Sequence, residues 1–167
     1  MKIETAFISF KGTNHEKNED NYTIEKGENH FLLAVADGVG GLPFADIASR
    51  VAVDSFSKIT IPSTTSLESF FDDANKRILE ESEKKHRLMG STLVSTLLNT
   101  STNELSIAHV GDSRAYIFTN DSIWRTRDDT LVQELVEMGI ITDEQAFDHP
   151  NKNRLNKALG TCTSLTV

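Results

Sequence analysis

The chain has 167 residues, with 17 Lys or Arg against 25 Asp or Glu, giving a formal net charge of −8. This length fits one domain with a sizeable core, and the acidic balance argues against nucleic acid or an anionic membrane as the main partner. Cys162 is the only cysteine, which excludes an internal disulfide and a cysteine metal site. The N-terminus has no apolar stretch, and the longest apolar run, residues 31–36, is too short to span a membrane. We therefore expect a single cytoplasmic domain over residues 1–167.

The first half of the chain alternates strand and helix patterns. Residues 2–11 have strand-like composition with rough alternation, and residues 21–25 and 31–36 are expected to form two further strands. Apolar residues then recur at helical spacing from Ile47 to Ile59. Thr65 and Glu68 have the spacing of a capping box. The helix that this box would start is expected to bury Leu67, Phe70, Phe71, Ala74 and Ile78.

The second half begins with strands and ends with short helices. We expect strands over residues 91–98 and 104–110, and a hairpin formed by residues 114–119 and 122–125. Capping-box spacings, separated by Gly139, then predict two short helices that start at Thr130 and Thr142. Residues 153–159 are expected to add a final helical turn or two. Two strand blocks interleaved with two long helices predict an α+β fold with largely antiparallel strands.

Asp37 is the most informative residue for function. It ends the apolar run Phe31–Ala36 and opens the turn Asp37-Gly-Val-Gly-Gly41. A carboxylate at the end of a buried strand needs a compensating cation or donors, and glycines allow backbone carbonyls to approach the same point. Hard cations such as Mg²⁺ or Mn²⁺ prefer this oxygen-rich setting. A tight Asp-Gly turn in a hairpin is the alternative interpretation.

Two more acidic motifs occur where loops meet predicted strands. Asn18-Glu-Asp20 comes just before residues 21–25, and Gly111-Asp-Ser-Arg114 follows the apolar strand that ends at Val110. Carboxylates at the ends of neighbouring strands can converge on one rim, where they repel one another unless cations lie between them.

These motifs, together with Gly90-Ser-Thr92, have the order and rough spacing found in the PPM-type, metal-dependent protein serine/threonine phosphatases, and residues 128–160 resemble the flap-like helical segment of the bacterial branch. The resemblance covers residues 12–160. It implies an α-β-β-α sandwich of four layers, in which antiparallel sheets are flanked by helices. It also implies Mn²⁺- or Mg²⁺-dependent hydrolysis of phosphoserine and phosphothreonine in proteins, and a cognate kinase as a pathway partner.

The resemblance also implies roles for individual residues. Asp37 would bridge two cations, and the Gly38 carbonyl would ligate one of them. Glu19 and Asp20 would hold waters or ligate weakly, and Asp112 would help to bind a third, looser ion. The motif Gly90-Ser-Thr92 is expected to mark a strand start rather than chemistry. Arg114 is expected to pair with a carboxylate.

Two residues and the C-terminal segment depart from the family pattern. Where the family often has a phosphate-binding arginine, this chain has His15, which lacks the bidentate guanidinium. Lys11 or Lys17 could serve instead. Asp129 stands where relatives often have histidine.

The family continues beyond Gly160 with strands that carry further metal-binding aspartates, whereas only residues 161–167 follow here. We therefore expect part of the C-terminal edge to be missing and the cations to bind weakly. A phosphoprotein-binding relative without activity, or one piece of a split enzyme, are the competing hypotheses.

Overall fold

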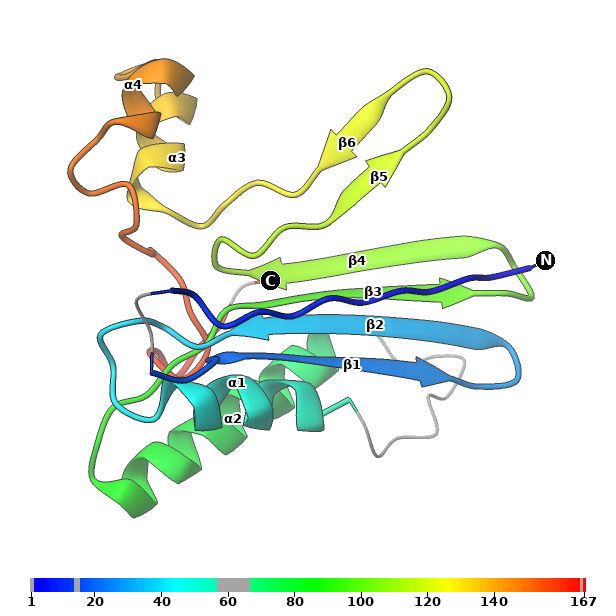
Figure 1. Cartoon of the computed structure of the whole chain (residues 1–167), viewed down its shortest axis with the longest axis horizontal. Helices are drawn as coiled ribbons and strands as arrows, with labels where there is room; N and C mark the ends of the chain where they lie inside the picture. Colours follow the sequence, from blue (N-terminus) through cyan, green and yellow to red (C-terminus); the bar gives the residue numbers. More distant parts are fainter. Residues whose placement is uncertain (1, 14–15, 57–66, 166) are drawn as a thin grey trace.

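The computed structural model of the chain describes residues 2–13, 16–56, 67–165 and 167. Its centre is an antiparallel sheet with the strand order β1-β2-β3-β4 (Figure 1). A separate two-stranded sheet pairs β5 with β6. The strands are β1 (Asp20–Lys26), β2 (His30–Asp37), β3 (Leu93–Asn99), β4 (Glu104–Val110), β5 (Tyr116–Phe118) and β6 (Ile123–Arg125). The strand predictions from residue 21 to residue 125 are therefore confirmed.

Helices α1 (Ala45–Asp54) and α2 (Leu67–Lys85) cover one face of the large sheet (Figure 1). Alternate residues of β2 are buried against them because successive strand side chains point to opposite faces. All five side chains that were expected to be buried on α2 lie in this core. The ring of Phe56 packs 5.0 Å from that of Phe70 and 6.1 Å from that of Phe71. Ile59 and Thr65 lie outside the described residues.

Two short helices, α3 (Leu131–Glu137) and α4 (Asp143–Phe147), follow the hairpin. The side chain of Thr130 accepts a hydrogen bond from Gln133 N, and Thr142 and Gln145 form a complete capping box, as their spacing predicts. Gly139 has φ +69° between the two helices. The α+β class with antiparallel sheets flanked by helices is confirmed. Among the described helices, none combines the length and apolar character needed to cross a bilayer.

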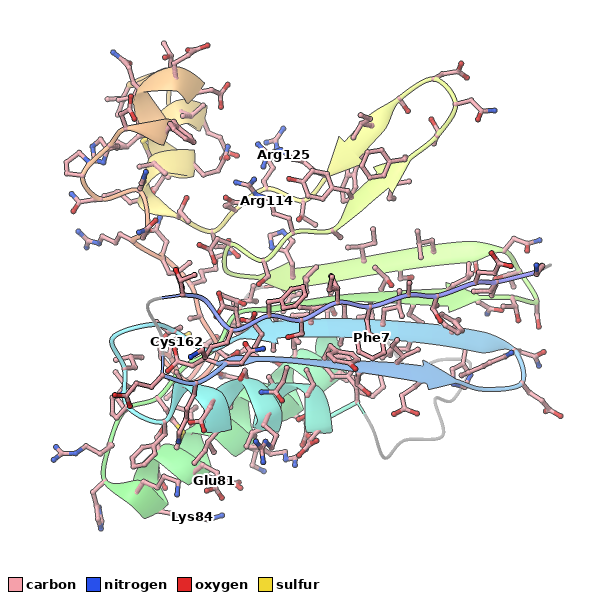
Figure 2. All side chains as sticks on the ribbon, in the orientation of Figure 1. Phe7, Glu81, Lys84, Arg114, Arg125 and Cys162 are labelled. Carbon is pink, nitrogen blue, oxygen red and sulfur yellow. The ribbon has the colours of Figure 1, made fainter. Side chains whose placement is uncertain are left out.

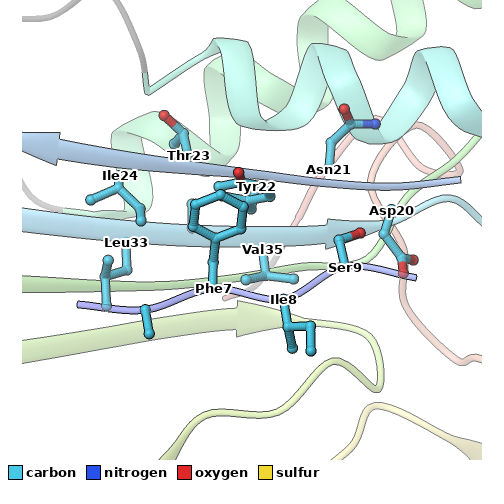
Figure 3. Close-up of a pocket in the computed structure, with 12 residues that line it drawn as sticks. Phe7, Ile8, Ser9, Asp20, Asn21, Tyr22, Thr23, Ile24, Leu33 and Val35 are labelled. Atoms are coloured by element: carbon cyan, nitrogen blue, oxygen red, sulfur yellow. The ribbon is translucent and has the colours of Figure 1, made fainter. Parts of the chain in front are cut away.

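The expected strand over residues 2–11 is wrong. These residues run extended across the sheet face opposite the helices, and in the described ranges they join no sheet (Figure 1). The Phe7 ring packs 4.4 Å from the Tyr22 ring, beside a cavity of about 250 Å³ that Leu33 and Val35 also line (Figure 3). The Phe7–Tyr22 ring contact and a hydrogen bond of 2.7 Å from Asn18 Nδ2 to Ser9 Oγ join this segment to the rest of the chain.

The expected helical turn over residues 153–159 is also wrong. Leu159 and Ser91 exchange backbone hydrogen bonds of 2.8 and 3.1 Å, so this segment is extended and adds to the sheet rim. The buried Asn75 of α2 then holds the following residues: its Oδ1 accepts from Gly160 N at 2.7 Å and its Nδ2 donates to the Cys162 carbonyl at 3.0 Å. Pairing with other segments outweighs the local helical preference here.

Candidate metal centre

The acidic positions that the sequence singles out lie along one rim of the large sheet. Asp20 is the register partner of Asp37 in the β1–β2 pair, so the two side chains leave the same face of the sheet. On the other side of Asp37 stands Thr92, whose N–H donates to the Asp37 carbonyl at 2.8 Å. Gly111 comes directly after β4 and packs against Thr92, which brings the loop of Asp112 to the same rim.

Burial and neighbouring charges act in the same direction on Asp37. Burial has the largest effect, followed by the charge of Asp20 and a hydrogen bond shared with its carboxyl group. Together with Asp112 and Glu19 they raise the pKa of Asp37 from 3.8 to about 6. The Asp37 side chain nonetheless keeps an exposed edge. Two carboxyl groups in this arrangement favour a shared proton or a cation between them.

Gly38 is where the backbone approaches most closely. A Cβ on this residue would lie 2.3 Å from the Ala45 carbonyl oxygen, so no larger residue fits without a shift of α1. Gly38 N donates to the Glu19 carbonyl at 3.1 Å, which ties the first two acidic motifs together. The alternative interpretation of a hairpin turn is wrong, because α1 follows Asp37-Gly38 and β2 pairs with β1 and β3.

A cavity of about 340 Å³ opens over this rim. Asp20, Asp37, Glu19 and Gly38 line it, and Lys17 contributes the cationic side chain of the lining. The Lys17 Nζ lies 3.6 Å from an oxygen of Asp46, so it is held beside the carboxylates rather than among them. His15, the expected phosphate-binding residue, lies outside the described residues.

Asp112 and Glu19 raise the pKa of Asp37 less than Asp20 does. The Glu19 carbonyl accepts from both Gly38 N and the Ser49 hydroxyl, which anchors the motif to α1. Burial raises the pKa of Asp112, and the charge of Asp128 adds to this effect, while a backbone hydrogen bond and the charge of Arg114 offset part of it. Asp112 follows Gly111, whose φ of +100° is a conformation that glycine adopts without strain.

Two residues beyond the predicted ligands fix the Asp112 loop. Arg114 donates two hydrogen bonds to Asp128, of 2.7 and 2.6 Å, so its expected carboxylate partner is confirmed. Figure 2 shows Arg114 beside Arg125 at the base of the hairpin. Asp129 Oδ2 accepts from Gly111 N at 3.1 Å, and its Oδ1 lies 3.1 Å from Lys157 Nζ. Asp129 therefore ties the loop to the C-terminal segment.

The donor set fits a weakly held, hydrated cation. Within residues 2–13, 16–56, 67–165 and 167, no three His, Cys, Asp or Glu side chains gather closely enough to hold an ion by themselves. Asp20 and Asp37 form a close pair, and Mg²⁺ is commonly held by one or two carboxylates while it keeps several waters. Burial and the neighbouring Asp20 carboxyl group raise the pKa of Asp37, and a cation bound between the two carboxyl groups would act in the opposite direction.

Comparison with known proteins identifies the family of the chain. Residues 11–163 match the family model described as protein phosphatase 2C. The chain belongs to the protein phosphatase 2C family. A serine/threonine phosphatase, stp, of Listeria welshimeri is 38% identical over 171 residues, which cover 95% of this chain and 67% of the relative. The bacterial branch and the class of metal-dependent serine/threonine phosphatases are thereby confirmed.

Solved structures of this family agree with the fold. The crystal structure of the serine/threonine phosphatase Stp1 from Staphylococcus aureus has a TM-score of 0.84 and 30% identity, and the match covers 99% of this chain and 71% of that one. The catalytic domain of the phosphatase PstP, solved in complex with two manganese ions, has a TM-score of 0.75 and 30% identity over 96% of this chain and 66% of its own.

Ser91 and Thr92, expected only to mark a strand start, hold the backbone of Asp37. The Ser91 hydroxyl donates to the Asp37 carbonyl at 2.9 Å, and Thr92 Oγ1 accepts from Asp37 N at 3.1 Å. Two adjacent hydroxyl residues at the start of a strand that neighbours the Asp37 strand are the signal that could have revealed them.

Proposed function

We propose that this chain hydrolyses phosphoserine and phosphothreonine esters of proteins in the cavity above Asp20 and Asp37. The observation that carries the proposal is the register pairing of these two carboxyl groups beside a solvent-open cavity that both of them line. Burial, and after it the neighbouring Asp20 carboxyl group, raises the pKa of Asp37 to about 6. Such a pair is suited to divalent cations and to phosphoryl transfer. Family membership supports the same reaction.

Within this proposal each residue of the rim has one role. Asp37 would bridge two Mn²⁺ or Mg²⁺ ions, and the Gly38 carbonyl and Asp112 would add ligands, Asp112 for a third, looser ion. When bound, the cations lower the pKa of a water molecule and neutralise charge on the phosphoryl oxygens. Asp20 and Glu19 would orient the attacking water by accepting its hydrogen bonds. The two manganese ions of the PstP structure support manganese as the first ion to test.

The substrate phosphate needs a cation of the protein as well. Lys17 lines the cavity beside Glu19, which supports it as one candidate, and His15 remains the candidate that the sequence suggests. Replacing His15 with Arg should lower the Michaelis constant for a phosphothreonine peptide if His15 contacts the phosphate, because guanidinium forms bidentate bonds to phosphate. Lys17→Ala should raise the constant if Lys17 does so. An unchanged constant in either variant removes that residue from the role.

Phosphorylated proteins would be the partners of this site, and a serine/threonine kinase would supply them. The net charge of −8 supports neither nucleic acid nor an anionic membrane as a ligand.

The proposal is tested by hydrolysis of an aryl phosphate and of a phosphothreonine peptide across a manganese titration, with a chelator control. Saturable activity that Asp37→Asn abolishes and Asp121→Asn leaves intact is the expected result. Asp121 lies in the exposed turn of the β5–β6 hairpin and serves as a matched control.

A phosphoprotein-binding module is the second candidate, favoured by the small number of carboxylates that gather at the described rim. Retained phosphopeptide binding without any manganese-dependent hydrolysis would establish it in place of the enzyme.

A further inference from the structure

Thr92 occupies the middle of the rim. It is 2% exposed and stands directly before β3, between Asp37 on one side and Gly111 on the other. In the hydrogen-bonded pairs of an antiparallel ladder, the two opposed residues exchange both backbone bonds. Here Thr92 N donates to the Asp37 carbonyl, but Asp37 N donates to the Thr92 side chain, Oγ1, at 3.1 Å. The Thr92 hydroxyl therefore takes the place of a backbone carbonyl as the acceptor for Asp37 N.

The same hydroxyl reaches the neighbouring acidic motif. Thr92 Oγ1 lies 2.6 Å from the hydroxyl oxygen of Ser113, the residue after Asp112. One hydroxyl has a donor and two acceptor positions, so it can serve the Asp37 N–H and the Ser113 hydroxyl at once. Among the described residues, this is the side-chain hydrogen-bond path that joins the Asp37 strand to the Asp112 loop.

The methyl group of Thr92 fixes the direction of that hydroxyl. A Cβ on Gly111 would lie 2.6 Å from Thr92 Cγ2, so the methyl packs directly against the glycine backbone. Branched side chains have few χ1 rotamers. Rotating Thr92 would drive its methyl out of this contact and break both hydroxyl bonds. The side chain is thus locked between the two motifs.

We propose that Thr92 is a positioning residue that sets the spacing between Asp37 and the Asp112 loop and thereby couples cation binding at the two carboxylates. The inference rests on the proposed function, since it assumes that these carboxylates bind divalent cations. A threonine that only filled space would need its methyl group and backbone but not its hydroxyl, and this difference can be measured.

Three variants separate the hydroxyl from the packing. Thr92→Val keeps the shape and removes the hydroxyl, whereas Thr92→Ser keeps the hydroxyl. Thr96→Val makes the same change four residues along, where the strand pairs with Leu33 and Ile107 instead of the rim. Manganese affinity is measured by calorimetry on the chelator-treated full chain, and urea unfolding in chelator reports the fold.

Thr92→Val is expected to weaken manganese binding about three- to tenfold, the range set by one net hydrogen bond. Thr92→Ser should stay nearer to the wild type than Thr92→Val, and Thr96→Val should match the wild type. Asp112→Asn should also weaken binding less in the Thr92→Val background than in the wild type, because the coupling has already been lost.

Equal manganese affinity of the wild type and a folded Thr92→Val variant would overturn the inference and leave the proposed function intact. Additive effects of Thr92→Val and Asp112→Asn would overturn the coupling. If Thr92→Val does not fold, Ser113→Ala removes the same bond from its other end and must weaken binding, or the inference fails. If the wild type binds no manganese, the proposed function and this inference fail together.

Discussion

Replacing Asp37 with Asn should stabilise the metal-free protein at neutral pH. The carboxyl group has a pKa of about 6 in the folded protein against 3.8 for the free side chain. The folded state therefore holds a proton that the unfolded chain has already released, and the protein loses stability as the pH rises from about 4 to about 6. Above that range the full cost of the ionised carboxylate is present, and the neutral amide avoids it.

The size of the effect follows from the shift. At about 1.4 kcal/mol for each pH unit, the two pKa values differ by an upper bound of about 3 kcal/mol. The Asp37 side chain is exposed at its edge, so solvent screening reduces this to about 1 kcal/mol. In a chain of this length such a gain raises the melting temperature by about 2–4 °C.

Thermal unfolding in chelator at pH 4.5 and pH 7.5 measures this prediction. The gain in Asp37→Asn should be present at pH 7.5 and much smaller at pH 4.5, and Asp121→Asn should show neither. Added manganese should then stabilise the wild type and not Asp37→Asn. A variant that is less stable than the wild type at pH 7.5 without metal, or a gain that does not depend on pH, would refute the electrostatic argument.

Two further changes test the backbone of the rim. Gly38→Ala should destabilise the protein by about 1–3 kcal/mol, because the new Cβ would meet the Ala45 carbonyl oxygen at 2.3 Å. Gly40→Ala is the control, since no atom lies within 4 Å of its Cβ position. Equal urea midpoints for the two variants would contradict the clash. Asn75→Ala should cost about 1–3 kcal/mol, since it leaves the buried N–H of Gly160 without its acceptor; an unchanged urea midpoint would show that this bond contributes nothing.

The sequence predicted those parts of the fold in which the local pattern agrees with the final packing. Strand β4 was expected at its observed bounds because its apolar residues are set off by a polar loop and a glycine. Residues 153–159 failed because their backbone bonds go to Ser91 and to the segment around Thr130. These partners lie far away in the sequence, where local periodicity carries no information about them.

In the candidate site, too, local sequence patterns revealed some residues, while the roles of others depend on contacts between distant segments. Asp37 and Gly38 could be found because an acid after an apolar strand, followed by glycine, is unusual in composition and position, and Asp20 could be found because its acidic motif directly precedes a predicted strand. Thr92 could not be assigned a role, since its hydroxyl acts only through a register that places it opposite Asp37. Asp129 was recognised as a departure, but its bond to Gly111 depends on how the segment after the hairpin returns to β4.

Anomalous diffraction at the manganese edge, from crystals of the chain soaked in millimolar Mn²⁺, tests the central claim most directly. We expect an anomalous peak about 2 Å from a carboxylate oxygen of Asp37, a second peak beside its other oxygen, and no peak there in Asp37→Asn. Ordered water or the ammonium group of Lys17 at that carboxylate, without anomalous signal, would contradict it.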